Sequence, residues 1–297
     1  MKFYLLSPQV PPNPHLFPMF VDTWRDNGIE IVDRIEESKI VLIDLHSRIA
    51  DYDERVIDFI CSSRIPIVTF DEFDKGGMSK LDWPDPLTEQ QERIFDHIEN
   101  EDIASIHFCR LLNKTRQYPS NGVFPFEKPI LYQEPILTAD ELFNRQYDIV
   151  WIANTAPQRE FFKEILQSYS KLKCKIILGE EKIPLQDWIN AHKEGKMFIS
   201  WSAGGYGDEK MQHLFSVAAA IKENNNQLFL HDFTHLENCI RPQPNPTIKD
   251  LDVILSVVND KEWLYEIYKN NYDFMTKYYS KEYIANDILQ KILKHLQ

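Results

Sequence analysis

Short apolar runs and amphipathic stretches alternate along the first half of the chain. The runs that are apolar almost throughout are predicted to be buried strands: Lys2–Leu6, Ile40–Leu45 and Ile65–Phe70. The stretches with helical spacing are Leu16–Asn27, Glu54–Ser62 and Thr88–Leu112, the last with a break near residues 100–102. Continuous apolar strands between helices are typical of a parallel sheet that is covered on both faces.

The same alternation starts again near residue 147. Strands are predicted at Tyr147–Ile152, Cys174–Leu178, Met197–Trp201 and Leu228–Leu230. Helices are predicted at Pro157–Tyr169, Pro184–Glu194, Glu209–Glu223, Leu251–Asn259, Lys261–Lys277 and Lys281–Leu296. We therefore predict an α/β fold of two Rossmann-like parallel-sheet domains, residues 1–138 and 139–297, joined near Thr138–Arg145. Ligands of such folds bind at the carboxyl ends of the strands, in the crevice between the two modules.

Composition and charge narrow the picture further. The chain has 297 residues, enough for two ordinary domains, and 43% of them are hydrophobic. The net charge of −13 disfavours electrostatic binding to duplex DNA or to an anionic membrane, although a local basic cleft would escape that average. The four cysteines form no CxxC pair, no apolar run is long enough to cross a bilayer, and residues 1–8 lack the pattern of a signal peptide. We therefore expect a cytoplasmic protein with reduced thiols.

A glycine cluster follows the strand predicted at Met197–Trp201. The segment Ser200–Lys210 reads SWSAGGYGDEK, and a helix is predicted to begin at its end. Glycines let backbone amides approach a ligand, and a helix N-terminus carries partial positive charge that suits a diphosphate. The pattern is neither a P-loop nor the GxGxxG fingerprint. A flexible connection between strand and helix is an equally good interpretation of the glycines alone.

Several blocks in the second half, taken in order, resemble one group of enzymes. They are DIVWIANTAPQR (Asp148–Arg159), ILGEEKIPLQDW (Ile177–Trp188), ISWSAGGYG (Ile199–Gly207), HDFTHLE (His231–Glu237) and the tyrosine-rich tail Tyr272–Leu296. Their order and spacing resemble the C-terminal, donor-binding domain of bacterial and viral GT-B glycosyltransferases of the family-1 type. The resemblance covers about residues 147–297. It implies two domains that face a central cleft, with the last helices crossing back onto the first domain.

The resemblance also implies a nucleotide-sugar donor, bound without a metal or a further cofactor. By position, Arg159 would bind the diphosphate, with Lys182 as a second candidate. A fixed cation there would stabilise the charge that builds up on the leaving diphosphate as the glycosidic bond breaks. The other donor-binding candidates are Asn154, Gly204, Gly205, Tyr206, Gly207, Asp208, Gln212, His235 and Glu237.

The helix after the glycine loop departs from the family pattern. The family carries an arginine and a glutamate there, and the glutamate binds the donor ribose. This chain has neither residue in the corresponding stretch, which begins Gln212-His213-Leu214. Gln212 or His213 could take over that role, and Asp208 or Glu209 could bind a sugar hydroxyl instead. Donor identity, and activity itself, stay open on this evidence.

The first half carries no matching motif, so the acceptor side is inferred from strand ends. An inverting enzyme needs a general base for the acceptor hydroxyl, and a retaining enzyme does not. The candidate catalytic bases lie at the ends of predicted buried strands: His46, Asp44 and Asp71, with His15 and Glu72 nearby. Asp71 and Glu72 are the pair to test first. A strand-end aspartate is also a common helix cap, and a single histidine is also a common surface residue.

The leading hypothesis is a hexosyl- or pentosyltransferase that moves a sugar from a nucleotide-sugar donor to an acceptor hydroxyl. The acceptor would be a glycan, another small hydroxylated compound or a modified nucleobase. One alternative is a non-catalytic nucleotide-binding protein of the same fold, which the missing arginine and glutamate motivate. Another is a nucleotide-sugar epimerase. The fold alone does not choose among these.

Overall fold

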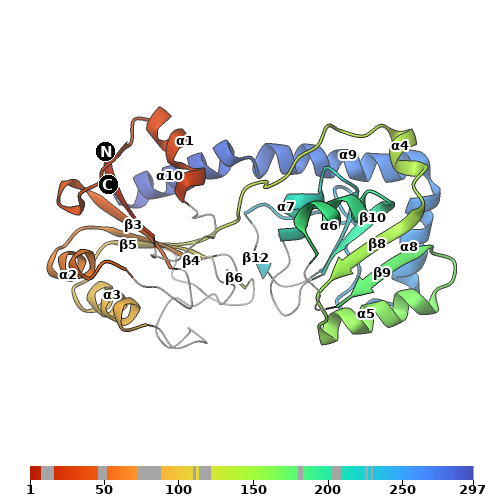
Figure 1. Ribbon diagram of the computed structural model, residues 1–297, viewed down its shortest axis with the longest axis horizontal. Helices are drawn as coiled ribbons and strands as arrows, with labels where there is room; N and C mark the ends of the chain where they lie inside the picture. Colours follow the sequence, from red (N-terminus) through yellow and green to blue (C-terminus); the bar gives the residue numbers. More distant parts are fainter. Residues whose placement is uncertain are drawn as a thin grey trace. The chain divides into compact units, whose positions relative to one another are not determined.

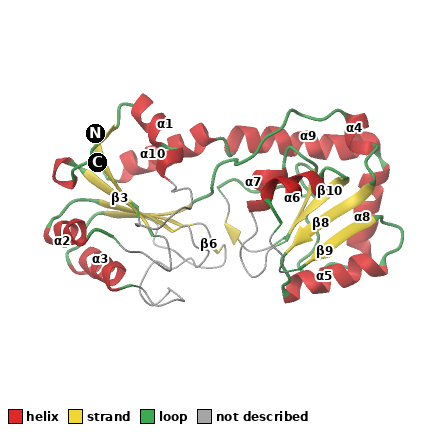
Figure 2. Cartoon of the chain, viewed as in Figure 1, coloured by secondary structure: helices red, strands yellow, loops and turns green. Residues whose placement is uncertain are grey.

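The chain forms two compact units. The computed structural model describes residues 1–7, 17–45, 52–71, 88–109, 112–113, 122–179, 183–201, 209–224, 227–228 and 230–296. The first unit comprises Met1–Glu127, Asn226–Leu230 and Lys281–Gln297, and the second comprises Lys128–Asn225 and His231–Ser280. Each unit is an α/β layer structure around its own sheet (Figures 1 and 2).

The first unit is built on a six-stranded parallel sheet of order β2-β1-β3-β4-β5-β7. Its strands are β1 (Lys2–Leu6), β2 (Glu30–Ile31), β3 (Ile40–Asp44), β4 (Ile67–Asp71), β5 (Ser105–Cys109) and β7 (Val123–Pro125). The central strand β3 is buried along its whole length, which explains why it is apolar without alternation. A short antiparallel pair, β6 (Leu112–Asn113) and β12 (Gln227–Leu228), belongs to the same unit.

Helices cover both faces of this sheet (Figure 1). They are α1 (Val21–Asp26), α2 (Glu54–Ser62), α3 (Glu89–Asn100) and α10 (Lys281–His295), with 3-10 turns η1 (Phe17–Met19) and η2 (Ile35–Glu37). The helix α10 returns from the end of the chain and packs on α1, where the buried indole of Trp24 donates to the carbonyl of Ala285 at 2.9 Å. This long-range hydrogen bond joins the two ends of the sequence within one unit.

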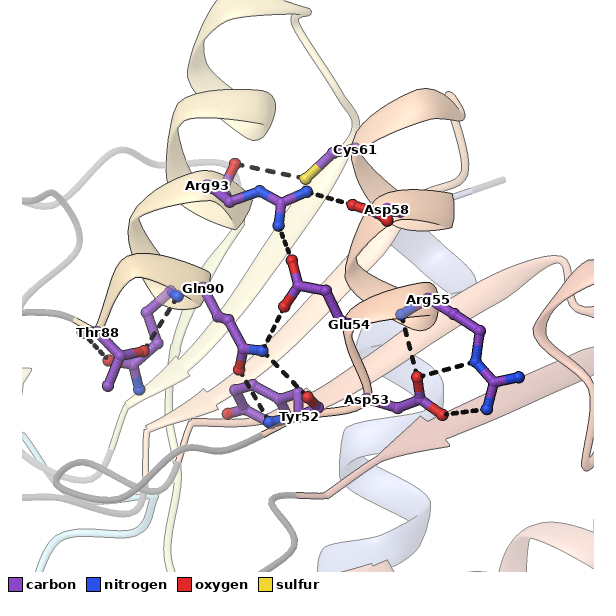
Figure 3. A network of polar contacts seen from close by, with 10 residues as sticks. Tyr52, Asp53, Glu54, Arg55, Asp58, Cys61, Thr88, Gln90 and Arg93 are labelled. Carbon is purple, nitrogen blue, oxygen red and sulfur yellow. Dashed lines mark hydrogen bonds and ion pairs between the residues drawn. The ribbon is translucent and has the colours of Figure 1, made fainter.

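A polar network joins α2 to α3 at the surface of the first unit (Figure 3). The guanidinium of Arg93 on α3 contacts the carboxylates of Glu54 and, at 2.6 Å, Asp58 on α2. The side-chain amide of Gln90 donates to Glu54 at 2.7 Å and exchanges hydrogen bonds with the backbone of Tyr52. These contacts fix α3 against α2 above the apolar face that both helices bury.

The second unit contains a four-stranded parallel sheet of order β11-β10-β8-β9. Its strands are β8 (Tyr147–Ala153), β9 (Cys174–Leu178), β10 (Gly195–Ser200) and β11 (Ala219–Lys222). Its helices are α4 (Ala139–Phe143), α5 (Pro157–Ser168), α6 (Leu185–His192), α7 (Glu209–Leu214), α8 (Ile248–Asn259) and α9 (Lys261–Tyr278). One large apolar cluster joins the inner strands to α5, α8 and α9. The helices α6 and α7 contact each other and β10.

The predicted fold class is confirmed, since the six-stranded and the four-stranded sheet are each parallel and lie among helices. Three secondary-structure predictions were wrong in part. The strand predicted at Leu228–Leu230 in the second module forms as β12, which belongs to the first unit. The stretch Thr88–Leu112 ends as strand β5, because the helix stops before Asp102, whose φ is 51°. The stretch Glu209–Glu223 ends as strand β11. Its residues 217–221 are fully buried, and a segment that is buried on every side shows no helical periodicity.

The chain passes from the first unit to the second between Glu127 and Lys128. The sequence pattern predicts the join later, near Thr138–Arg145. Residues 128–137 group with the second unit because they are hydrogen-bonded to it, for example through the amide of Ile130 and the carbonyl of Tyr279 at 2.8 Å. No regular secondary structure forms between Phe126 and Thr138, so the apolar pattern could not show this attachment.

Candidate functional site

A cavity of about 590 Å³ opens at the carboxyl end of β8 in the second unit. We call it the β8 cavity. The described residues that line it are Ile152, Ala153, Asn154, Thr155, Arg159, Ile183, Leu185, Trp188, Lys210 and His213. They come from the end of β8, the first turn of α5, the start of α6 and the helix α7. The cavity therefore lies where parallel α/β sheets bind their ligands.

Arg159 is the best-fixed cation of the β8 cavity. It is buried, with its Nε donating to the carbonyl of Trp201 at 3.0 Å and its Nη1 donating to the carbonyl of Asn154 at 2.9 Å. Burial lowers the pKa of its guanidinium, and Glu223 opposes that shift. An arginine stays charged even so, and these two backbone contacts hold the charge in one place.

The first turn of α5 adds a second electrostatic element. Pro157 opens the helix, and no side chain caps its N-terminus in the described structure. The preceding residues Asn154 and Thr155 line the cavity. A helix N-terminus carries partial positive charge, so an anion in the cavity would be stabilised beside it.

Lys210 is a second cation in the same cavity, and the sequence interpretation missed it. It lies on α7, with its ammonium 3.4 Å from the carbonyl of Ile199 and 5.9 Å from the centre of the Trp151 ring. Burial and the nearby Arg159 charge lower the pKa of Lys210 to about 7. Its place directly after a glycine cluster, at the start of a helix, was the signal available in the sequence.

Another part of the cavity wall is apolar and aromatic. Trp188 donates its indole N–H to the carbonyl of Ile152 at 3.1 Å, and its ring is flanked edge-on by His192 and His213. His192 is fully buried, which lowers its pKa to about 4, and its Nδ1 bonds to the carbonyl of Trp188 at 2.8 Å. Leu185, by contrast, is half exposed at the cavity wall. A flat, partly apolar group would fit against this wall.

Only some of the predicted donor-binding residues line the β8 cavity. Asn154 and Arg159 both line the β8 cavity, as does His213, which was considered as a substitute for the missing family residues. Gln212 is fully buried and its amide donates instead to the carbonyl of Lys128 at 2.9 Å. Neighbouring residues of a helix point to different sides, so Gln212 and His213 have different surroundings.

His235 and Glu237 lie in a tight turn of the second unit, apart from the described lining of the β8 cavity. The Nδ1 of His235 accepts the amide of Arg241 at 2.9 Å. His235 lines a smaller cavity of about 270 Å³ with Thr247, Asp250 and neighbouring residues. Burial lowers its pKa, an effect that the Asp250 charge opposes. The side chain of Glu237 is exposed.

Other predicted residues lie outside the described structure. These are His15, His46, Glu72, Lys182, Gly204, Gly205, Tyr206, Gly207 and Asp208. Asp71 is the last residue of β4, and its side chain is not described. The roles assigned to these residues from the sequence stay predictions.

Two features are absent from the ranges of residues that the structure describes. In those ranges, no three His, Cys, Asp or Glu side chains gather in a way that could hold a metal ion. None of the described helices is long and apolar enough to span a membrane.

The fold is similar to those of solved glycosyltransferases. One is an alpha-glucosyltransferase in complex with UDP and a 13-mer DNA containing an HMU base, with a TM-score of 0.58, 11% sequence identity and 99% of both chains covered. Another is Alr3699/HepE from Anabaena in complex with UDP, with a TM-score of 0.56, 11% identity, and 99% of this chain and 100% of that one covered. No protein-family model and no curated protein matches the sequence.

TarM is a third similar structure, with a TM-score of 0.52 and 14% identity, over 85% of this chain and 54% of TarM. At these identities the similarity concerns the fold. The chain has a GT-B glycosyltransferase fold, as the motif resemblance in its second half predicted.

Proposed function

We propose that this chain is a glycosyltransferase that takes its sugar from a nucleotide-sugar donor bound in the β8 cavity. One observation carries the proposal: two cations, Arg159 and Lys210, and the uncapped N-terminus of α5 meet in a single cavity at the carboxyl end of the sheet. A donor diphosphate carries negative charge that increases as the sugar leaves. Cations fixed before the reaction stabilise that change without reorganisation.

The apolar wall supports a nucleotide as the rest of the donor. Ile183, Leu185 and Trp188 face a cavity whose volume, about 590 Å³, lies in the range usual for small-molecule sites. UDP occurs in several similar structures, so UDP and UDP-sugars are the first ligands to test. In this proposal the side-chain cations balance the diphosphate, and no metal takes part.

The acceptor in this proposal is a hydroxyl on a glycan or another small compound. One similar structure holds DNA with an HMU base, which keeps a modified nucleobase among the candidates. The net charge of −13 favours a glycan or a small acceptor, because an acidic protein repels a DNA backbone. His46 and Asp71 stay the candidate bases on the acceptor side.

A second candidate function is nucleotide binding without catalysis. The observation in its favour concerns Gln212, which stands where the resembling family places donor-binding residues. The side-chain amide of Gln212 instead donates to the backbone carbonyl of Lys128, so it is not free to bind a donor. Turnover of a UDP-sugar with a glycan acceptor separates this candidate from the first. It predicts UDP binding with no sugar transfer.

Calorimetric titration with UDP and UDP-sugars tests the proposed site. Losing one charge-assisted contact costs about 1.5–3 kcal/mol, so Arg159→Ala should weaken UDP binding by about 10- to 100-fold. Lys163→Ala is the matched control. Lys163 is a cation of the same helix that pairs with Glu160 at 2.9 Å and is not among the residues lining the cavity.

Lys210→Met provides an independent variant, since Arg159 also holds backbone carbonyls and its loss could disturb the fold. It too should weaken UDP binding. If wild-type protein binds neither UDP nor any UDP-sugar at millimolar concentration, the proposed donor site is wrong.

A further inference from the structure

An extended segment of the second unit is bonded to three of its helices. We call residues 128–137 the strap. It follows Glu127, the last residue of the first unit in that part of the chain, and it precedes α4. Although it has no regular secondary structure, much of its backbone is hydrogen-bonded. The conformation of an irregular segment is set by the groups that its backbone bonds to, so these partners indicate its structural role.

The first partner is α7. The amide of buried Gln212 donates to the carbonyl of Lys128 at 2.9 Å. The backbone carbonyl of Gln212 accepts the amides of Leu131 at 3.2 Å and of Tyr132 at 3.3 Å. Gln212 thus contacts the strap at three points. Two other residues of α7, Lys210 and His213, line the β8 cavity.

The second partner is α6, which carries Leu185 and Trp188 of the cavity wall. Glu134 of the strap pairs with Lys193, the C-cap residue of α6, at 2.6 Å. The Glu134 amide donates to the hydroxyl of Ser216 at 3.0 Å. Ser216 is fully buried and lies just after α7. Both helices of the cavity wall are therefore attached to the same strap.

The third partner is α9, which provides no described residue of the cavity lining. The hydroxyl of Tyr272 accepts from the side chain of Gln133 at 2.9 Å and donates to the carbonyl of Glu134 at 3.1 Å. The hydroxyl of Tyr268 accepts the amide of Leu137 at 3.1 Å and donates to the carbonyl of Ser216 at 3.0 Å. The strap is thus hydrogen-bonded to α9 as well as attached to the two cavity helices.

We propose that the strap is a structural part of the β8 cavity. Gln212 and Glu134 are positioning residues that hold α7 and α6 through contacts outside the cavity, and a ligand inside the cavity stabilises the strap in return. The proposal rests on the proposed function only for the identity of that ligand. Binding free energies are reciprocal: if an ordered strap favours the ligand, the ligand must favour an ordered strap by the same factor.

Hydrogen exchange measured by mass spectrometry tests the proposal first in the ligand-free protein. Gln212→Ala removes the side-chain bond to Lys128, and Glu134→Gln removes the ion pair with Lys193 at the protein surface. Either change should speed exchange in the strap and in the helix it releases, α7 or α6. If the amides of α6 and α7 exchange at wild-type rates in both variants, the strap does not hold the cavity wall and the proposal is wrong.

The second arm adds UDP. In wild-type protein, UDP should slow exchange at the strap, and in Gln212→Ala that protection should shrink while UDP binds about tenfold more weakly, within the range usual for coupled sites. Tyr272→Phe is the matched control. It loosens the strap from α9, so it should raise exchange in the strap yet keep the UDP-dependent protection.

The two proposals fail in different ways. UDP binding without any protection of the strap would overturn the coupling and leave the donor site standing. Absence of UDP binding would overturn the donor site and the ligand response together, and the ligand-free arm would still decide whether the strap holds α6 and α7.

Discussion

At the residue scale, we expect Lys210 to make ligand binding in the β8 cavity sensitive to pH. Burial and the neighbouring Arg159 charge lower its pKa to about 7 in the unoccupied protein, far below the usual value for a lysine. Below that pH the side chain is charged and attracts a diphosphate; above it the side chain is neutral. The dissociation constant for UDP should therefore rise up to tenfold per pH unit between about pH 7 and 9.

The same titration of Lys210→Arg provides the check. A guanidinium stays charged over this range, so its UDP affinity should be nearly independent of pH above 7. Ionisation of UDP itself affects both proteins alike, so the difference between the two pH profiles isolates the contribution of Lys210. A pH profile that is the same in wild type and Lys210→Arg would show that Lys210 does not titrate in this range.

At the scale of elements, the junction of β5 and β7 depends on a glycine. Gly122 has a φ of 101°, and a Cβ there would lie 2.8 Å from the carbonyl oxygen of Ser105. Its own carbonyl accepts the amide of His107 on β5. A side chain must therefore either strain the backbone or push the two strands apart.

Gly28 is the natural comparison, because its φ is 79° and no atom lies within 4 Å of an added Cβ. Gly28→Ala should lower the free energy of unfolding by about 1–2 kcal/mol, because alanine disfavours a positive φ. Gly122→Ala should lose clearly more, since the clash adds to that cost. Urea denaturation of both variants measures the difference, and equal losses would mean that the strands adjust without cost.

At the scale of the whole molecule, the two units should respond differently to the donor. The lining of the β8 cavity lies in the second unit, so UDP should stabilise that unit directly. At a concentration 100 times the dissociation constant the gain is about 2.7 kcal/mol. The buried indoles Trp24 and Trp151 report on the first and second unit, respectively.

Fluorine NMR of 5-fluorotryptophan-labelled protein follows both indoles through thermal unfolding. UDP should raise the midpoint temperature of the unfolding transition that Trp151 reports. With UDP bound, the transition that Trp24 reports should then occur at the lower temperature. Equal shifts at both indoles would instead mean that the units unfold as one cooperative body. A shift at Trp24 alone would place the nucleotide in the first unit.

The sequence alone determined the fold class and part of the candidate site. Buried parallel strands are apolar almost throughout, so β1, β3, β4, β8, β9 and β10 could be predicted from the apolar runs, close to their observed bounds. Asn154 and Arg159 could also be predicted from the sequence, because ligand sites in this fold class lie at the carboxyl ends of strands and both residues come soon after β8. Both line the β8 cavity.

Only the tertiary structure decided the rest, because long-range contacts outweigh local pattern. Residues 217–221 are surrounded by protein on every side, so no periodicity marked the strand β11. On α7, Lys210 and His213 face the cavity while Gln212 bonds to the strap, 84 residues earlier in the chain. Which way each of these side chains points depends on the orientation of α7 between the cavity and the strap, and packing against distant segments sets that orientation.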